Sequence, residues 1–200
     1  MDDAHARNRA ALRVLSASTR LSRSFFRRDT QIVARDLLGR YLVHVVNGVS
    51  RIGMIVETEA YLGPHDLAAH SRHGPTTRNA PMFGPIGHAY VYMIYGMHEC
   101  MNVVTERPGK GSAVLLRALE PVANCHGRTN GPALLAKAMG ITRALTGHDL
   151  ISDELYLTRG EGSAGKSVVA ARRIGVEYAG RWAQRRLRFY LRGNPFVSRT

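Results

Sequence analysis

Residues 41–62 read YLVHVVNGVSRIGMIVETEAYL and hold two β-rich apolar runs joined by Asn47-Gly48. An Asn-Gly pair between two such runs is a strong short-range signal for a β-hairpin, because both residues tolerate the positive φ of a type I′ turn. The pattern predicts two long antiparallel strands, and any fold of this chain must accommodate them in one sheet.

The second of these strands carries acidic groups near its end. Side chains alternate between the two faces of an extended strand. One face is apolar and is formed by Ile52, Met54 and Val56. The other holds Gly53, Ile55, Glu57, Glu59 and Tyr61. Two glutamates thus stand in line on an otherwise apolar strand, and we expect at least one of them to be partly buried.

The rest of the pattern adds strands and a few helices. Helices are predicted over residues 31–39, which end at Gly39, and over residues 133–139, closed by Gly140. Strands are predicted over 88–96, on both sides of Pro108-Gly109 as a hairpin, and over 187–193. Pro64 would open a short helix through Ser71. This arrangement predicts an α+β fold, a single domain with a twisted, mostly antiparallel β-sheet and surrounding helices.

Length and composition set the domain organisation. Two hundred residues suffice for one domain with a sizeable core. Residues 1–23 are polar and rich in Arg and Ala, so we expect a flexible basic arm there and a single domain over residues 24–200. Neither an apolar run of about 18 residues nor a signal-peptide pattern is present. We therefore expect a cytoplasmic monomer with no membrane contact.

The charge balance indicates a polyanionic partner. The chain has 28 basic and 15 acidic residues, a formal charge of +13. Its closing run, RWAQRRLRFYLRGNPFVSRT, contains six arginines and no acid. A solvated protein surface usually mixes both signs, so nucleic acid is the first candidate. An Arg-biased genome is the alternative explanation for part of this excess.

The stretch ETEAYLGPHDLAAHSRHG holds ligand types for a metal ion, at His65, Asp66, His70 and His73. It contains no HExxH motif, and Cys100 and Cys125 show no paired spacing. The spacing therefore argues against a metal site. A metal-dependent phosphohydrolase that uses Asp66, His70 and His73 stays open as an alternative.

Acid/base chemistry suits the same stretch better. A carboxylate at the end of a rigid strand can be desolvated enough to take a proton from water, and Glu57 and Glu59 are the candidates. Four tyrosines, Tyr61, Tyr90, Tyr92 and Tyr95, are expected nearby. Beside a basic surface, aromatic side chains offer stacking platforms for bases turned out of a duplex. Surface glutamates and core tyrosines are the alternative reading of both groups.

Three longer motifs carry a resemblance: IVETEAYLGPHDLAAHS, RNAPMFGPIGHAYVYMIYGMHECMN and VLLRALEP. Together with the late segment RIGVEYAGRWAQRRLRFYLRGNPFVS, they resemble the alkyladenine (3-methyladenine) DNA glycosylase family from about Phe25 to Val197. The resemblance implies hydrolysis of the N-glycosidic bond of alkylated or deaminated purines in double-stranded DNA, which initiates base-excision repair. It implies no metal or organic cofactor, and a nucleoid-associated location if the organism is bacterial.

The resemblance also implies roles for single residues. Glu59 matches the general base that activates water, and Glu57 matches a non-catalytic position. Arg117 and the backbone carbonyl of Ile174 match groups that hold this water. The flipped base is sandwiched by the residues that match Tyr61, His70 and Tyr92. Asn102 matches the residue that excludes the 2-amino group of guanine.

On the DNA side, Tyr95 matches the wedge that enters the minor groove, and we expect Met97 and Arg78 on the same DNA-binding surface. His98, Glu99 and a longer TERPGKG loop depart from better-known vertebrate members. The acid at Glu99 leaves the DNA affinity open. Only three lysines are present, Lys110, Lys137 and Lys166, and none lies in the proposed pocket segments. A glycosylase without lyase activity is therefore expected, and a non-catalytic binder of damaged or bent DNA is the alternative.

Overall fold

The computed structural model of the protein describes residues 20–160, 162–163 and 165–200. The basic arm predicted over residues 1–23 therefore falls for the most part outside the described residues. Leu21 is already buried, and the Arg20 guanidinium forms an ion pair with Asp153 at 2.6 Å. Within the described part of the chain, no helix has the length and apolar character needed to cross a bilayer.

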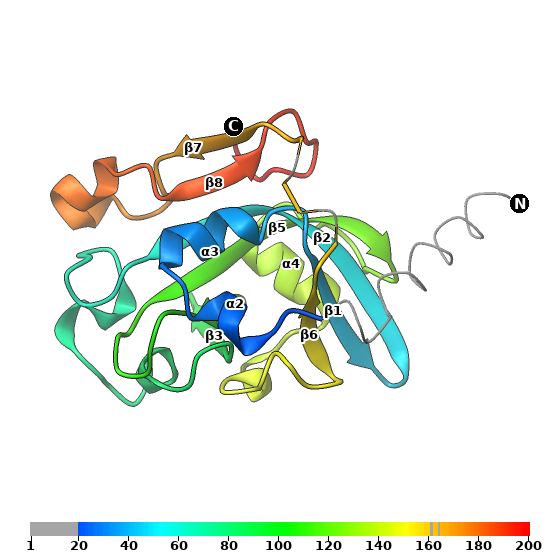
Figure 1. The fold of residues 1–200 in the computed structure, drawn as a ribbon, viewed down its shortest axis with the longest axis horizontal. Coiled ribbons are helices and arrows are strands. Elements are labelled where there is room, and N and C mark those ends of the chain that lie inside the picture. The colour runs from blue at the N-terminus through cyan, green and yellow to red at the C-terminus, as the bar shows by residue number, and fades with distance from the viewer. Residues whose placement is uncertain (1–19, 161, 164) are drawn as a thin grey trace, which may run out of the picture.

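One antiparallel sheet organises the whole chain (Figure 1). Its main path runs in the order β3-β4-β5-β2-β1-β6, while β8 pairs with β2 and β7 pairs with β8. The strands are β1 (Tyr41–Val46), β2 (Val49–Tyr61), β3 (Ala89–Ile94), β4 (His98–Val104), β5 (Ala113–Ala123), β6 (Leu155–Thr158), β7 (Val168–Ala171) and β8 (Arg188–Leu191). The predicted α+β class with an antiparallel sheet is confirmed.

The hairpins form where turn residues predict them. β1 and β2 meet at the Val46–Val49 pair, and Asn47 and Gly48 take φ values of 50° and 76°. β4 and β5 pair on either side of the turn that contains Pro108-Gly109, and β8 returns to the sheet beside β2. The local sequence signals for these strands are therefore confirmed.

β2 changes partners along its length, and this places the two glutamates in the interior. Its first half pairs with β1, and its second half, from Glu57 to Glu59, pairs with β8. β5 pairs with its other edge from Ile52 to Tyr61. Register shifts flank Glu57, so a bulge interrupts the regular alternation predicted for this strand. Both glutamate side chains are fully buried, which exceeds the partial burial expected.

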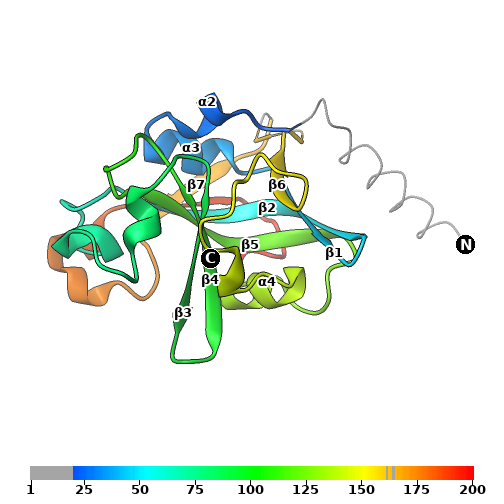
Figure 2. The ribbon, with the colours of Figure 1, turned by 90° about the horizontal axis from the view of Figure 1, so that it is seen from below.

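Short helices cover the sheet. α2 (Arg23–Phe26) leads into α3 (Thr30–Asp36), which Asp29 caps, and Gly140 closes α4 (Pro132–Met139) in a left-handed conformation as predicted. Figure 2 shows α3 and α4 on opposite faces of the central strands β2 and β5. The 3₁₀ helices are η2 (His70–His73), η3 (Ala80–Phe83), η4 (Arg143–Leu145) and η5 (Glu177–Gln184).

The helix predicted from Pro64 through Ser71 is wrong. This segment forms turns that lead into η2. The reason lies in Asp66, whose carboxylate accepts the backbone N–H groups of Leu62 and Ala68. Such local side-chain bonds compete with the helical ladder, and here they hold the loop in place.

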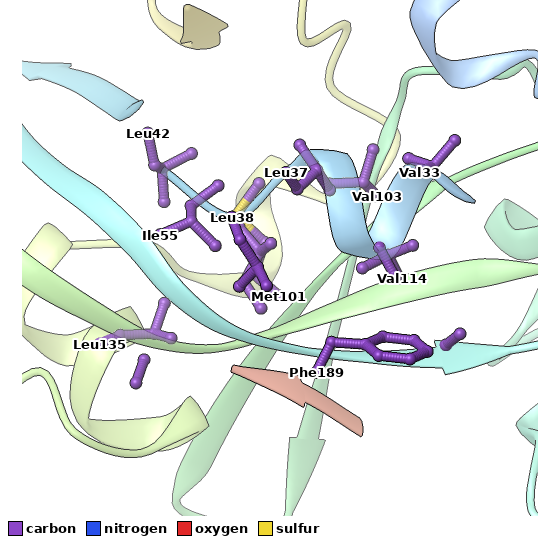
Figure 3. Packing of buried hydrophobic residues seen from close by; sticks show 14 of the residues in the cluster. Val33, Leu37, Leu38, Leu42, Ile55, Met101, Val103, Val114, Leu135 and Phe189 are labelled. Carbon is purple, nitrogen blue, oxygen red and sulfur yellow. The ribbon is translucent and has the colours of Figure 1, made fainter. Parts of the chain in front are cut away.

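The main core lies between α3 and the strands. Figure 3 shows Val33 and Leu37 pointing from α3 toward Val114 on β5 and Val103 on β4. Phe189 of β8 packs on the same face, where its ring lies under the Arg35 guanidinium of α3 at 4.2 Å. All five apolar side chains are completely buried. The core therefore fixes β2, β5 and β8 against one another, and these are the strands that carry the buried charges.

Two neighbouring residues of α3 give a matched test of this core. Val33→Ala removes buried methyl groups and should lower the free energy of unfolding by about 2 kcal/mol. Ile32→Ala makes the same β-branched-to-Ala change at a position that is 49% exposed, and should change stability by less than about 0.5 kcal/mol. Urea denaturation measures both variants. Equal losses in the two would contradict the assigned core face of α3.

Candidate active site

Glu57 forms the centre of a buried charge network. Its Oε1 accepts hydrogen bonds from Arg117 Nε at 3.0 Å and from Arg188 Nη1 at 2.9 Å. Its Oε2 accepts the Ser198 N–H at 2.7 Å. Both oxygens of Glu57 are therefore engaged, and they orient Arg117 rather than face open space.

Glu59 also binds Arg117, but its two oxygens differ in their partners. Oε1 accepts the Ile174 N–H at 2.8 Å and lies 3.2 Å from Arg117 Nη1. Oε2 accepts the Tyr61 hydroxyl at 2.8 Å. The Ile174 N–H contact was not foreseen from the sequence, which indicated only its carbonyl group. Among the described residues, Glu59 Oε2 thus accepts a hydrogen bond from one group, the Tyr61 hydroxyl.

Burial and the neighbouring charges fix the protonation states of Arg117 and Tyr61. Burial alone would lower the pKa of Arg117, but the carboxylates of Glu59 and Glu57 outweigh it, so its pKa rises above the ordinary value. Burial, followed by the charge of Glu59, raises the pKa of Tyr61 well above its usual range. Arg117 therefore stays charged and the Tyr61 hydroxyl keeps the proton that it donates to Glu59.

A cavity of about 360 Å³ lies beside this network. Three groups that bind Glu59, namely Tyr61, Arg117 and Ile174, contribute to its lining, whereas Glu59 itself is fully buried behind them and does not line the cavity. The cavity size is near the lower end of the range of about 300–1,000 Å³ typical of small-molecule sites. Of the residues predicted for the pocket, His70, Tyr92, Asn102 and Tyr95 line it as well.

Aromatic side chains form one side of the cavity. The rings of His70 and Tyr92 meet edge to face with their centroids 4.4 Å apart, and His70 Nδ1 lies 3.0 Å from the Tyr90 hydroxyl. Burial, followed by the charges of Arg78 and Arg72, lowers the pKa of His70 from 6.5 to about 4. His70 is therefore neutral at pH 7.

Asn102 lies on β4 and its position is fixed. It is almost fully buried, and its Nδ2 donates a hydrogen bond to the backbone oxygen of Tyr90 at 3.0 Å. The burial of a satisfied amide leaves this side chain little freedom to move. It presents a rigid polar surface to the cavity.

The β3–β4 hairpin projects from the body of the molecule (Figure 2). At its turn, Tyr95 is 86% exposed and Met97 is 71% exposed, two of the most exposed large apolar side chains described. Tyr95 has a φ of 51°, which is a left-handed conformation that non-glycine residues rarely adopt. Arg78 does not line the cavity. It binds the Met93 backbone oxygen on the hairpin at 2.9 Å.

Asp66 and Arg173 form a clamp behind the site that sequence reasoning missed. Their two hydrogen bonds measure 2.6 and 2.8 Å, and both side chains are fully buried. Arg173 also donates to the Ala60 oxygen and stacks over the Tyr61 ring at 4.7 Å. The clamp thus holds Tyr61 and the adjacent Ile174 in place. No local pattern indicates a contact between residues 107 positions apart.

The same clamp bears on the metal alternative. Arg173 occupies both oxygens of Asp66, while His70 faces Tyr90 and Tyr92. His73 contacts Arg72 at the surface. Among residues 20–160, 162–163 and 165–200, no group of three or more His, Cys, Asp or Glu side chains is placed to hold a metal ion. The structure does not bring Asp66, His70 and His73 together as ligands.

A family profile described as Methylpurine-DNA glycosylase matches residues 24–195. The chain belongs to this family. A protein of Legionella pneumophila (strain Lens) is 54% identical over 181 residues, which cover 90% of this chain and 99% of that protein. One from Anaeromyxobacter sp. (strain Fw109-5) is 55% identical over 181 residues, covering 90% and 93%. Both carry the provisional name 3-methyladenine DNA glycosylase, and the resemblance read from the motifs is confirmed.

In this methylpurine-DNA glycosylase family member, Glu99 is not an unpartnered acid. Its Oε1 accepts the Arg143 backbone N–H at 2.8 Å and lies 4.0 Å from Arg143 Nε. The carboxylate therefore links β4 to η4, and its charge has a cation beside it.

The Asp66–Arg173 clamp can be tested by comparison with an exposed ion pair that has a similar N–O distance. Asp66→Asn leaves the buried Arg173 guanidinium without its counter-charge and should lower the free energy of unfolding by about 3 kcal/mol or more. Asp36→Asn is the control, because the Arg28–Asp36 pair also measures 2.7 Å but has side chains 38% and 41% exposed. It should cost less than about 1 kcal/mol. Chemical denaturation measures both, and similar small losses would argue against the clamp.

The pKa of His70 predicts a pH dependence of stability. Its value is about 4 when folded and 6.5 when unfolded, so between these pH values the unfolded chain binds more protons. The contribution of His70 is therefore constant above about pH 6.5 and becomes destabilising as the pH falls toward 4. Urea denaturation of wild type and His70→Gln between pH 7 and 4.5 measures it. The wild type should lose more stability on acidification, and parallel curves would contradict the lowered pKa.

Proposed function

We propose that this protein is a DNA glycosylase that removes alkylated or deaminated purines from double-stranded DNA and so initiates base-excision repair. The observation that carries the proposal is the buried Glu59 carboxylate, bound by Tyr61, Arg117 and Ile174, three residues that line an aromatic cavity directly in front of it. The family membership and the net charge of +13 support a DNA substrate. The protein would act as a monomer on DNA in the cytoplasm, at the nucleoid in a bacterium.

Glu59 acts as the general base. Its Oε1 is engaged by a backbone N–H and a guanidinium, whereas Oε2 accepts only the Tyr61 hydroxyl. Oε2 therefore has a lone pair available for the proton of a water molecule. Arg117 and the Ile174 carbonyl hold this water in place. Glu57 has both oxygens occupied and supports Arg117.

The reaction balances without a metal ion or an organic cofactor. Water forms a bond to the sugar carbon C1′ and gives a proton to Glu59, while the N-glycosidic bond breaks and its electron pair leaves with the purine. An alkylated purine is already cationic, so it departs as a neutral molecule and needs little help from a strong acid. The products are a free base and an abasic site.

The flipped base lies between Tyr61 on one side and the His70–Tyr92 pair on the other. Stacking is worth about 1–3 kcal/mol per base and favours electron-poor, damaged purines. Because burial raises the pKa of Tyr90 to about 12, its hydroxyl stays protonated and can donate to His70 Nδ1. The other ring nitrogen, Nε2–H, is then a donor toward the edge of the base.

Selectivity and flipping use the remaining groups. The fixed Asn102 amide crowds the place that the 2-amino group of a normal guanine would occupy. Tyr95, at the hairpin turn, fills the space that the flipped base leaves, and Met97 and Arg78 contact DNA beside it. An inserted side chain of this kind keeps the base from returning to the stack.

The protein is proposed to have no lyase activity. Strand cleavage by a glycosylase requires an amine that attacks C1′. Among the described residues that line the cavity there is no lysine. Lys110 lies 3.7 Å from Glu106, outside the cavity, and Lys137 belongs to α4. The expected product is therefore an intact strand with an abasic site.

Glu59→Gln tests the proposal directly. Its amide oxygen can still accept the Ile174 N–H and its amide NH2 can donate to the Tyr61 hydroxyl oxygen, but the amide cannot take a proton, so base release should fall by about 10²- to 10⁴-fold. Duplex DNA with a single hypoxanthine and methylated duplex DNA are the substrates, and a chelator is present throughout. Glu154→Gln, whose side chain is 56% exposed, is the matched control and should keep full activity.

Binding distinguishes the alternatives. Glu59→Gln should bind lesion duplexes within about threefold of wild type, because the aromatic pocket is intact. Full release by this variant would remove Glu59 as the base. Lesion binding without release by wild type, on every substrate, would instead favour a non-catalytic damage-binding protein, and loss of release on adding chelator would favour the metal-dependent alternative.

A further inference from the structure

A second hollow lies on the opposite face of the β3–β4 hairpin from the cavity. Its volume is about 450 Å³, and Arg78, Val91, Met93, Gly96, Arg143 and Thr146 line it. Tyr92 borders both hollows. We refer to it as the Arg78–Arg143 groove. The β3–β4 hairpin, whose turn carries Tyr95, thus lies between the cavity and the Arg78–Arg143 groove.

The floor of the groove is the outer edge of β3, the first strand of the sheet, beyond the part that residues 146–149 cover. Thr146 Oγ1 satisfies both the N–H and the C=O of Val91. Two residues further, the C=O of Met93 accepts a hydrogen bond from Arg78 Nη2 at 2.9 Å. In an antiparallel strand the N–H and C=O of one residue point to the same side. The Met93 N–H therefore points into the groove as a further donor.

Arg143 has a fixed backbone and a loosely held side chain. Its N–H is bound by Glu99 at 2.8 Å, whereas its Nε lies 4.0 Å from the same carboxylate oxygen. The side chain is 62% exposed. An ion pair at this distance is weak in water, so the guanidinium can turn to a stronger partner at little cost.

Arg78 gives the groove its second cation. Arg78 is exposed, and its Nη2 donates to the Met93 oxygen. A guanidinium has five N–H donors, so others remain for a ligand. Glu99, the acid nearest to Arg143, is committed to the η4 backbone. Two guanidinium groups and a backbone N–H around one hollow match the oxygens of a phosphate.

We propose that the Arg78–Arg143 groove binds a backbone phosphate of the DNA strand opposite the damaged base. This inference rests on the proposed function. If the hairpin turn enters the minor groove, the strand with the flipped base passes over the cavity, and the complementary strand passes over the other face of the hairpin. The groove lies on that face and carries the complementary charge. The groove would hold the complementary strand in place while Tyr95 separates the damaged base from it.

Arg143→Gln and Arg78→Gln test the groove by DNA affinity. Each should raise the Kd for a lesion duplex about tenfold and reduce the slope of log Kd against log salt by about one. Arg159→Gln is the matched control. It removes the same charge from an exposed arginine that directly follows β6, on the opposite edge of the sheet, and should change the affinity only slightly.

Neutral phosphates identify the strand. Methylphosphonate replacement, one position at a time across the three nucleotides on each side of the lesion's partner, should weaken wild-type binding at one position. The same replacement should have a smaller effect on Arg143→Gln, because one of the two arginine contacts with this phosphate is already lost. The absence of an effect at every one of these positions of the complementary strand would overturn the proposal. So would equal affinities and salt slopes for Arg143→Gln and Arg159→Gln.

The binding assays keep this test separate from that of the proposed function. They need no base release, so a wild type that releases no base but shows the expected arginine and methylphosphonate effects supports the groove and contradicts the catalytic proposal. Base release by wild type without these effects supports the glycosylase and removes the groove. The two results are therefore distinguishable.

Discussion

The buried contact of Arg117 with Glu57 and Glu59 is the interaction on which the rest depends. Glu57 brings β2, β8 and the carboxyl-terminal segment together through Arg117, Arg188 and the Ser198 N–H. A buried charge that lost its partner would cost several kcal/mol, so each strand requires the others. The bonds that hold β2, β5 and β8 together through Glu57 and Arg117 also set the orientation of Glu59. Fold stability and the geometry of the site therefore share the same few atoms.

Local sequence signals predicted the elements well. Asn47-Gly48 and Gly140 each act through the φ that the backbone needs at one position, which requires no knowledge of distant residues. The helix expected after Pro64 failed because Asp66 binds neighbouring N–H groups and the far Arg173 at once. The Asp66 carboxylate is bound by the Arg173 guanidinium, which is a stronger partner than any group in a local helix.

The candidate site was only partly visible in the sequence. Alternation placed Glu57 and Glu59 side by side on β2 but gave no reason to prefer either one. The distinction arises from partners far along the chain: Ser198 completes Glu57, whereas Ile174 and Tyr61 leave an open position on Glu59. The supporting clamp had no local signal at all. A motif names the residues of such a site, while long-range contacts decide what each oxygen can do.

The hairpin turn has a consequence for how damage is searched for. Tyr95 adopts its left-handed conformation on a short turn with Gly96 beside it, at a φ that side chains other than glycine adopt at a cost of roughly 1 kcal/mol. In the proposed complex, a turn that the Met97 N–H to Ile94 oxygen bond already closes loses little backbone entropy on entering DNA. The work of opening then falls on the duplex, so weakly stacked or mispaired steps open first. Inspection speed would be governed by the mechanics of the DNA rather than by rearrangement of the protein.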